Sequence, residues 1–204
     1  MRQRPKRTYR KRRRALSEEE TRRRITEAAV ELHGTVGPAK TTVTDLAKRA
    51  GVSRMTVYNH FPTEADLFKA CSGHWAAHNP FPDPSTWGEV AEPEERLRSA
   101  LHELYGWYRL KRGMLENVIR DAAIMPDVSD LMDDFWGGYM GDVTDVLLDG
   151  WHPEGTDARE LEAMVTLVVD FDTWSALTDQ GLDTATAADL ATDLVVGAVR
   201  LRSN

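Results

Sequence analysis

Four polar side chains in one short segment of the sequence are suited to hydrogen bonding with a nucleic acid. They are Arg54, Thr56, Tyr58 and Asn59, and each can donate to a phosphate oxygen or to the edge of a base. An arginine can also hold guanine through two hydrogen bonds, which gives about 1–3 kcal/mol of discrimination between bases. A two-turn helix that carries these residues fits the DNA major groove, which is about 12 Å wide.

The elements that must position these side chains are two short helices. Apolar residues recur with helical spacing in the first of them, at Val43, Leu46, Ala47 and Ala50. Thr42 is placed to cap this helix and Gly51 to end it. Ser53 can cap a second helix that runs to about His60. Two short helices joined around a glycine form a helix-turn-helix, which delivers its second helix to the major groove.

Helical spacing predicts the flanking elements as well. Ser17 and Glu20 have the spacing of a capping box, so we expect a helix that begins at Ser17 and ends near Gly34. A further helix is expected to begin at Thr63. Residues 17–62 are therefore predicted to form a three-helix, helix-turn-helix DNA-binding domain.

Charge is divided unevenly along the 204 residues. Residues 1–60 hold 16 basic and 6 acidic side chains, whereas the remainder holds 10 basic and 27 acidic ones. The first 14 residues alone hold nine basic side chains and no acidic one. We predict residues 1–16 to be a disordered basic arm, because they lack apolar periodicity and their like charges repel. Such an arm would contact DNA phosphates or the minor groove; the alternatives are a solvated tail and non-specific RNA binding.

The rest of the chain is predicted to be helical, because no alternation typical of β-strands is present. This gives an all-α fold class. Helices are expected over 93–112, 114–125, 128–148 (with a kink at 137–138), 157–179 and 185–202. The proline-rich segment 79–92 is predicted to be a loop.

Composition and motifs exclude several other classes of protein. No stretch approaches the roughly 20 apolar residues of a membrane helix. The N-terminus also lacks the apolar core of a secretory signal, so we expect a cytoplasmic protein with no membrane partner. The single cysteine, Cys71, excludes an internal disulfide framework.

His74 and His78 are four residues apart, but such a pair alone is usually incidental, and no metal is expected. Phosphate-loop, dinucleotide-binding and nucleophile motifs are absent, so neither a cofactor nor an enzyme is expected.

A longer pattern of residues extends over about residues 20–70. It consists of Ile25, Ala28, Ala29, Leu32, Gly37, Thr41, Thr42, Asp45, Leu46, Ala47, Ala50, Gly51, Val52, Ser53, Thr56, Val57, Tyr58, His60, Phe61 and Leu67. This pattern resembles the tetracycline-repressor (TetR) family of bacterial transcription regulators. The remaining two-thirds of the chain resemble that family only in being helical and of fitting length.

The resemblance implies roles for side chains at the matching positions. Those implied to bind phosphates are Thr42, Tyr58 and His60. Those implied to face bases or their surroundings are Thr44, Arg54, Met55, Thr56 and Asn59. Met55 stands where a small residue or proline is usual in the family, so it would pack on a thymine methyl group. Glu64 stands where a phosphate-binding lysine is common, so we expect that contact to be lost and the basic arm to compensate.

The resemblance also implies that residues 63–204 form a helical regulatory and dimerisation domain. The expected interface consists of the helices over 157–179 and 185–202, and the alternative is two core helices of a monomer. The second helix is rich in small residues that permit close packing: Ala187, Ala188, Ala191, Gly197 and Ala198. A small amphipathic effector would bind among large apolar residues, each of which could instead be plain core. These candidates are Trp107, Tyr108, Met114, Met125, Phe135, Trp136, Tyr139 and Trp174.

The resemblance and the uneven charge together predict a ligand-responsive TetR-type regulator, most often a repressor in that family. It would bind a palindromic double-stranded DNA operator as a homodimer. Effector binding in the acidic body would move the helix that begins at Thr63 and lower operator affinity. The alternatives are a ligand-independent DNA-binding regulator or activator, and an enzyme with a borrowed helix-turn-helix.

Overall fold

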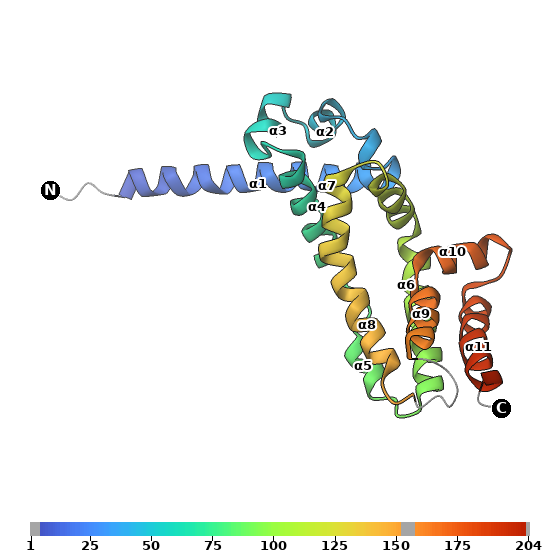
Figure 1. Cartoon of the computed structure of the whole chain (residues 1–204). Helices are drawn as coiled ribbons and strands as arrows, with labels where there is room; N and C mark the ends of the chain where they lie inside the picture. The colour runs from blue at the N-terminus through green and yellow to red at the C-terminus, as the bar shows by residue number, and fades with distance from the viewer. Residues whose placement is uncertain (1–4, 152–157, 203–204) are drawn as a thin grey trace. The chain divides into compact units, whose positions relative to one another are not determined.

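A computed structural model describes residues 5–151 and 158–202, which form helices and connecting turns without a β-strand (Figure 1). The helices are α1 (Pro5–Thr35), α2 (Val43–Ala50), α3 (Arg54–His60), α4 (Glu64–His78), α5 (Pro84–Gly88), α6 (Pro93–Ala122), α7 (Pro126–Met132), α8 (Gly138–Leu148), α9 (Ala158–Val169), α10 (Phe171–Asp179) and α11 (Thr184–Arg202). A 3-10 turn, η1 (Pro38–Lys40), precedes α2, and a π-helical turn, η2 (Asp133–Gly137), precedes α8. The all-α prediction is confirmed. Residues 1–4 of the predicted arm and residue 157 of a predicted helix lie outside the described residues.

The chain divides into two compact units, each considered by itself below. Unit 1 comprises Met1–Pro80 and Glu116–Leu131, and unit 2 comprises Phe81–Leu115 and Met132–Asn204. The predicted domain boundary at residues 62–63 differs from this division because α4 packs on α1. The apolar face of α4 is buried at Leu67, Phe68 and Cys71, so this helix belongs to the core of unit 1.

Helix α1 begins much earlier than the sequence suggested. It starts at Pro5 and continues through Ser17, so the predicted disordered arm is wrong for residues 5–16, and so is the predicted helix start. Ser17 is an interior position, where its carbonyl accepts a hydrogen bond from a threonine hydroxyl one turn later (2.8 Å). Two effects offset the repulsion between like charges. Lysine and arginine are good helix formers, and Arg14 forms an ion pair with Glu18 one turn away (2.9 Å).

Three other boundaries also differ from those predicted. Helix α5 interrupts the segment 79–92, because the Asp83 carboxylate caps it by accepting a backbone N–H (3.0 Å). Helix α6 is continuous where two helices were expected, since Gly113 in a helix interior costs only about 1 kcal/mol. The expected helix over 157–179 is divided into α9 and α10 at Asp170, whose carboxylate caps α10 (2.7 Å). The π-helical turn η2 ends beside the glycine pair at which a kink was predicted.

The core of unit 1 forms where α1 meets α2 and α4. Ile25 and Ala29 of α1 are fully buried there. His33 of α1 is also buried, with its ring 5.5 Å from that of Phe68 and its Nδ1 3.5 Å from the Cys71 Sγ. Burial lowers the pKa of His33 to about 4, although the nearby negative charge of an aspartate opposes the shift. Burial likewise raises the pKa of the Cys71 thiol to about 12, so both side chains are uncharged at neutral pH.

The core of unit 2 is organised around the first part of α6. Its fully buried residues include Leu97, Leu101 and Leu104. The hydroxyls of Tyr105 and Tyr108 donate to the carbonyls of Val168 and Val169, both at 2.6 Å. These carbonyls end α9, where a helix leaves acceptors unpaired, so the two tyrosines fix the end of α9 on α6.

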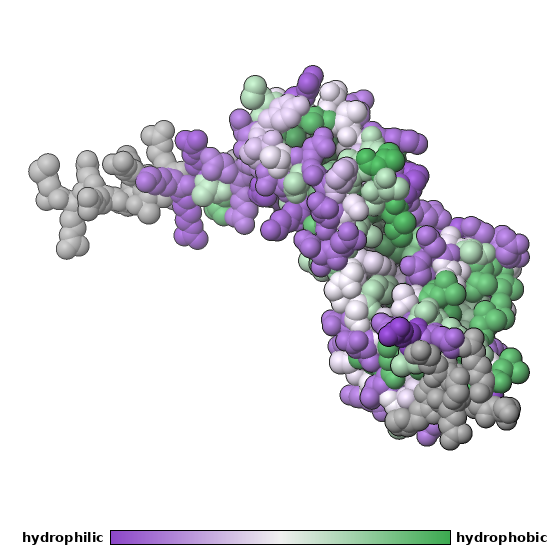
Figure 2. All heavy atoms as spheres, in the orientation of Figure 1, coloured by the Kyte–Doolittle hydropathy of each residue, from purple (hydrophilic) through white to green (hydrophobic). Residues whose placement is uncertain are grey.

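Helix α11 directs its small residues inward and leucines outward. Ala187, Ala188 and Ala191 are fully buried inside unit 2, so the expectation that they form an interface between subunits is wrong. They allow α11 to pack closely on α9 and α10 instead. The opposite side of α11 exposes Leu190 and Leu194, by 40% and 59%. Hydrophobic residues therefore lie at the surface on the side of unit 2 that α11 forms (Figure 2).

The buried His33 should make the stability of the protein depend on pH. An unperturbed histidine titrates near pH 6.5, so between about pH 6.5 and 4 the unfolded chain takes up a proton that the folded chain cannot. The free energy of unfolding should therefore fall by roughly 3 kcal/mol from this source as the pH falls through that range. His33→Gln removes the titrating group, and urea unfolding at several pH values should show a correspondingly weaker pH dependence.

The matched control is His78→Gln, which removes an exposed histidine of the same unit and should keep the wild-type pH dependence. If His33→Gln retained the full wild-type dependence, this account of His33 would be refuted.

Candidate nucleic-acid interface

The helix-turn-helix is formed by local signals at the ends of α2 and α3. The Thr42 hydroxyl caps α2 by accepting the N–H of Asp45 (3.1 Å), and the Ser53 hydroxyl caps α3 by accepting the N–H of Thr56 (3.1 Å). Gly51 ends α2 in the left-handed conformation, with φ of +65°, which glycine adopts without strain. Both predicted caps and the predicted glycine stop are therefore confirmed.

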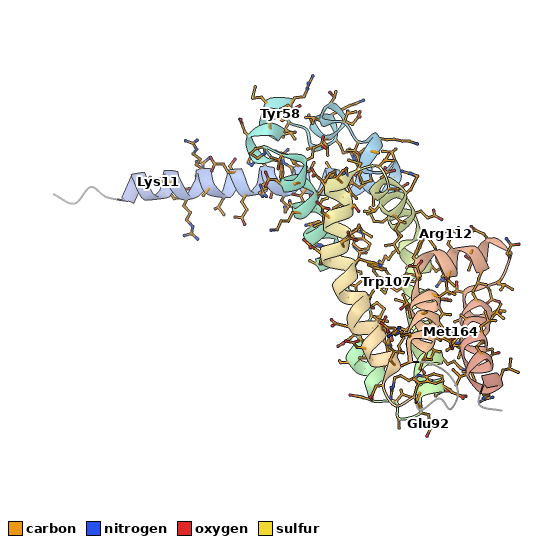
Figure 3. The ribbon with its side chains drawn as sticks, viewed as in Figure 1. Lys11, Tyr58, Glu92, Trp107, Arg112 and Met164 are labelled. Carbon is orange, nitrogen blue, oxygen red and sulfur yellow. The ribbon has the colours of Figure 1, made fainter. Side chains whose placement is uncertain are left out.

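The side chains predicted to contact DNA lie around α3 and at the start of α2. Tyr58 is 46% exposed and Met55 is 67% exposed, whereas Val57 between them is buried, so Tyr58 is not a core residue. Figure 3 shows Tyr58 at the outer side of α3. The other exposed members of the predicted set are Thr42, Thr44, Arg54 and Asn59, and its half-buried members are Thr56 and His60. This surface, formed by the eight predicted residues, is called the reading surface below.

Two arginines of α1 hold the C-terminal ends of the helix-turn-helix. Arg22 donates to the carbonyl of His60, the last residue of α3 (2.7 Å), and its guanidinium lies 4.1 Å from the centre of the Phe61 ring. Arg24 donates to the carbonyl of Ala50 at the end of α2 (3.1 Å). A guanidinium at a helix C-terminus satisfies a free carbonyl and complements the negative end of the helix dipole. These roles were not predicted, because a run of arginines does not show which distant carbonyls its members reach.

A buried carboxylate holds the turn that leads into α2. Asp121, near the end of α6, is 2% exposed and accepts a hydrogen bond from the Ala39 N–H (2.9 Å). Arg120 pairs with the same carboxylate (2.7 Å) and donates to the Val36 carbonyl (3.3 Å). Burial would raise the pKa of Asp121, but the hydrogen bonds from Arg120 and Ala39 outweigh it and lower the pKa. Gly37 has φ of +94°, and a Cβ there would collide with the Arg120 and Asp121 side chains. We call this arrangement the Asp121 latch.

Unit 2 contains a cluster of aromatic side chains in ring-to-ring contact. This aromatic cluster consists of Phe81, Trp107, Tyr108, Phe135, Trp136, Tyr139, Phe171 and Trp174. The Phe81 ring is central, with its centre between 4.8 and 5.6 Å from those of Trp107, Phe135, Trp136 and Tyr139. Six of the eight predicted effector-site residues belong to the cluster. Phe81 was missed because it lies in the predicted loop, and Phe171 was missed although it lies within the predicted helix over 157–179, because the break at Asp170 that places its ring was not predicted.

The two predicted methionines do not share this position. Met114 is half-buried on α6, and Met125 lies in the turn after α6, in the segment Glu116–Leu131 that belongs to unit 1. The indole N–H of Trp174 is buried, and no described residue accepts a hydrogen bond from it.

A pocket of about 560 Å³ lies in unit 1 rather than at the cluster, and it is lined by Leu32, Val36, Lys40, Thr41, Asp45, Lys48 and Arg49.

The histidine pair on α4 forms an intrahelical contact. The rings of His74 and His78 lie 4.3 Å apart, and the His78 Nδ1 donates to the His74 carbonyl (2.8 Å). Across residues 5–151 and 158–202, no group of three or more His, Cys, Asp or Glu side chains is arranged to hold a metal ion. In the same ranges, no helix is long and apolar enough to cross a membrane.

Comparison with known proteins supports the helix-turn-helix assignment. Residues 25–71 match the sequence model of the bacterial regulatory proteins of the tetR family. No curated protein matches the chain. Among solved structures, 34 chains match it.

Three of these structures illustrate the similarity. A TetR-like transcriptional regulator from Rhodococcus sp. RHA1 is 19% identical with a TM-score of 0.62, over 88% of this chain and 96% of that one. The transcriptional regulator FadR from Bacillus subtilis, solved with stearoyl-CoA, is 21% identical with a TM-score of 0.60, over 85% and 96%. The TetR-family regulator PfmR from Thermus thermophilus is 19% identical with a TM-score of 0.59, over 84% and 93%. At these identities the likeness concerns the fold. The match over residues 25–71 identifies this segment as a DNA-binding domain of the tetR family of bacterial regulatory proteins, and the solved structures of TetR-type regulators share the fold of most of the chain.

Proposed function

We propose that this regulator binds a palindromic DNA operator as a homodimer and releases it when a small amphipathic effector binds. The observation that carries the proposal is the reading surface, where Arg54, Tyr58 and Asn59 are exposed on a two-turn helix that is anchored by the buried Val57. Arginine and asparagine suit guanine and adenine edges in the major groove, and the tyrosine hydroxyl suits a phosphate. Repression is the role proposed for the bound state.

The proposed dimer interface is the outer face of α9 and α11. Leu167 of α9 is 63% exposed, and Leu190 and Leu194 lie one turn apart on α11, which contacts α9 within unit 2. Leucines exposed this far on neighbouring helices form an apolar patch that a second copy would cover. A two-fold dimer presents two reading surfaces, which matches the two half-sites of a palindrome.

The proposed effector site is the aromatic cluster. Its rings offer a large apolar contact area, and the unpaired Trp174 N–H offers a donor to an acceptor atom of the ligand. Phe135 is 43% exposed, so the cluster is open to solvent at its η2 side. The FadR structure of the same fold was solved with stearoyl-CoA, which makes a long-chain acyl thioester a reasonable first ligand to test.

The proposed coupling element is α6. This helix carries Trp107 and Tyr108 of the aromatic cluster and, about four turns later along the same helix, Asp121 of the latch. A ligand that displaces the first part of α6 would therefore disturb the carboxylate that holds Ala39. Ala39 lies in the turn that leads into α2. Loss of the latch would therefore make this turn more mobile and position the helix-turn-helix less precisely.

A ligand-independent regulator is the second candidate function. It is favoured by the ring-to-ring packing of the aromatic cluster and by the position of the 560 Å³ pocket in unit 1 instead. The two candidates differ in whether any ligand changes operator affinity.

DNA reading is tested by selecting duplexes from a random pool with the full-length protein. We expect a palindromic consensus, because a two-fold dimer presents identical reading surfaces. Arg54→Ala should weaken binding to the selected duplex by about 5- to 150-fold and relax base preference at one position of each half-site. Lys69→Ala, which removes an exposed cation of α4, is the control and should leave base preference unchanged. Recovery of no consensus would refute sequence-specific binding.

The dimer interface is tested by sedimentation equilibrium. Leu194→Glu places a charge in the proposed apolar interface and should shift the protein from dimer to monomer at micromolar concentration. Leu110→Glu is the matched control, because Leu110 is 67% exposed on α6 of the same unit and lies outside the proposed interface. A Leu194→Glu protein that sediments as the wild type would place the interface elsewhere.

The effector site and its coupling are tested with stearoyl-CoA as the probe. Binding should quench the fluorescence of the cluster tryptophans and lower operator affinity, and Trp136→Ala should weaken both effects.

Asp121→Ala should speed hydrogen exchange at the Ala39 amide and weaken operator binding about tenfold without ligand, whereas Asp130→Ala, an exposed control in α7, should do neither. Quenching with unchanged operator affinity would contradict the coupling and favour the ligand-independent candidate.

A further inference from the structure

The N-terminal part of α1 projects beyond the core of unit 1 as a helix. Residues 5–16, here called the basic extension, precede Arg22, the residue of α1 that donates a hydrogen bond to the end of α3. Within the described part of unit 1, no other element lies beside this part of α1 (Figure 1), and Figure 3 shows Lys11 on it. The side chains of Lys11, Arg12 and Arg13 are exposed.

Of the three acidic residues that follow the basic extension, Glu18 and Glu20 are engaged in ion pairs along the same helix, and only the charge of Glu19 has no ion pair among the described residues. Glu18 pairs with Arg14 (2.9 Å), and Glu20 pairs with Arg23 (2.7 Å), whose hydrogen bond lowers the pKa of Glu20. These exposed pairs leave the negative charge next to the extension largely compensated. The cationic residues 11–13 therefore set the sign of the potential at this end of unit 1.

We propose that the basic extension lies as a rigid helix along the phosphate backbone beside the operator half-site, outside both grooves. The proposal rests on the DNA-binding function proposed above. A helix with its side chains is about 10–12 Å across, whereas the minor groove is only about 6 Å wide, so a helical extension does not fit that groove. The wider major groove at the half-site is occupied by α3. The remaining part of the DNA whose negative charge complements the cationic extension is the phosphate backbone.

The attachment of α1 to α3 sets the reach of the extension. Arg22 holds the last residue of α3, and a rise of about 1.5 Å per residue places Lys11 about 16 Å farther along α1. That distance is about half of one turn of DNA, so the contacted phosphates lie roughly five base pairs from those beside the end of α3. Three consecutive helical residues point in directions about 100° apart, so about two of the cations at 11–13 can face one strand.

The test compares removal of charge with removal of the helix, using the duplex selected by the full-length protein. In one variant Lys11, Arg12 and Arg13 are each replaced by Gln. Loss of about two phosphate contacts should lower the slope of log Kd against log salt concentration by about 1.8. Ala15→Pro keeps every charge but breaks the helix before its core-packed part, and it should lower the slope similarly. Ala15→Gln, which retains the helix, is the matched control and should bind as the wild type.

Two further measurements identify the surface that the extension contacts. Replacing A·T by G·C pairs in the flanks should leave affinity unchanged, because phosphates carry no base information, whereas a chain inserted in the minor groove would favour A·T flanks. Hydroxyl-radical footprints should lose protection about five base pairs outside the half-site in the triple Gln variant. Tryptophan fluorescence during urea unfolding reports whether each variant is folded.

Several outcomes would overturn the proposal. Wild-type binding by Ala15→Pro would mean that a flexible tail serves equally well, and a preference for A·T flanks would mean that the tail enters the minor groove. Equal competition by single-stranded RNA would indicate a general RNA contact instead. An unchanged salt slope in the triple Gln variant would refute this inference alone, because the wild-type protein would still select its operator. Failure of the wild type to select any duplex would refute the proposed function itself.

Discussion

The hydrogen bond from Arg22 to the His60 carbonyl is the interaction on which the placement of α3 against α1 depends. Helix α3 has only seven residues, too few for an isolated helix to be stable in water. Its orientation must therefore come from its surroundings: its own Ser53 cap, burial of Val57, and the guanidinium at its C-terminal end. Because Arg22 belongs to α1, the orientation of α3 is tied to the longest helix of unit 1.

Helix α6 belongs in part to the unit that contains the helix-turn-helix and in part to the acidic remainder of the chain. Its first part carries aromatic side chains and fixes the end of α9 through two tyrosine hydroxyls. Its last turns carry Asp121 and Arg120, which hold the backbone between α1 and α2. The continuity of α6 is what the proposed coupling uses, because the aromatic side chains and Asp121 stand on one helix. A break at Gly113, which the sequence suggests, would have placed these two groups of residues on separate helices.

The parts of the structure that could be predicted from the sequence are those with local causes. Thr42, Gly51 and Ser53 act on residues within one turn, so the bounds of α2 and α3 and the exposed positions of α3 follow from spacing alone. The start of α1 could not be predicted, because a run of cations is compatible with both a helix and a disordered tail. Asp121 and Phe81 were missed because their partners lie far away in the chain. No periodicity in a single sequence shows that Asp121 reaches the amide of Ala39, 82 residues away.

The burial of Cys71 has a consequence for oxidative chemistry. Reaction with peroxide or with another thiol requires the thiolate, and a pKa of about 12 leaves almost none of it at neutral pH. The thiol is also 4% exposed and donates to the Phe68 carbonyl (3.2 Å), so an oxidant has little access to the sulfur. Since this is the single cysteine of the chain, the folded protein should resist disulfide cross-linking between copies. A cysteine introduced at the surface would then be the one reactive thiol, which permits site-specific attachment of a fluorophore without removing the native residue.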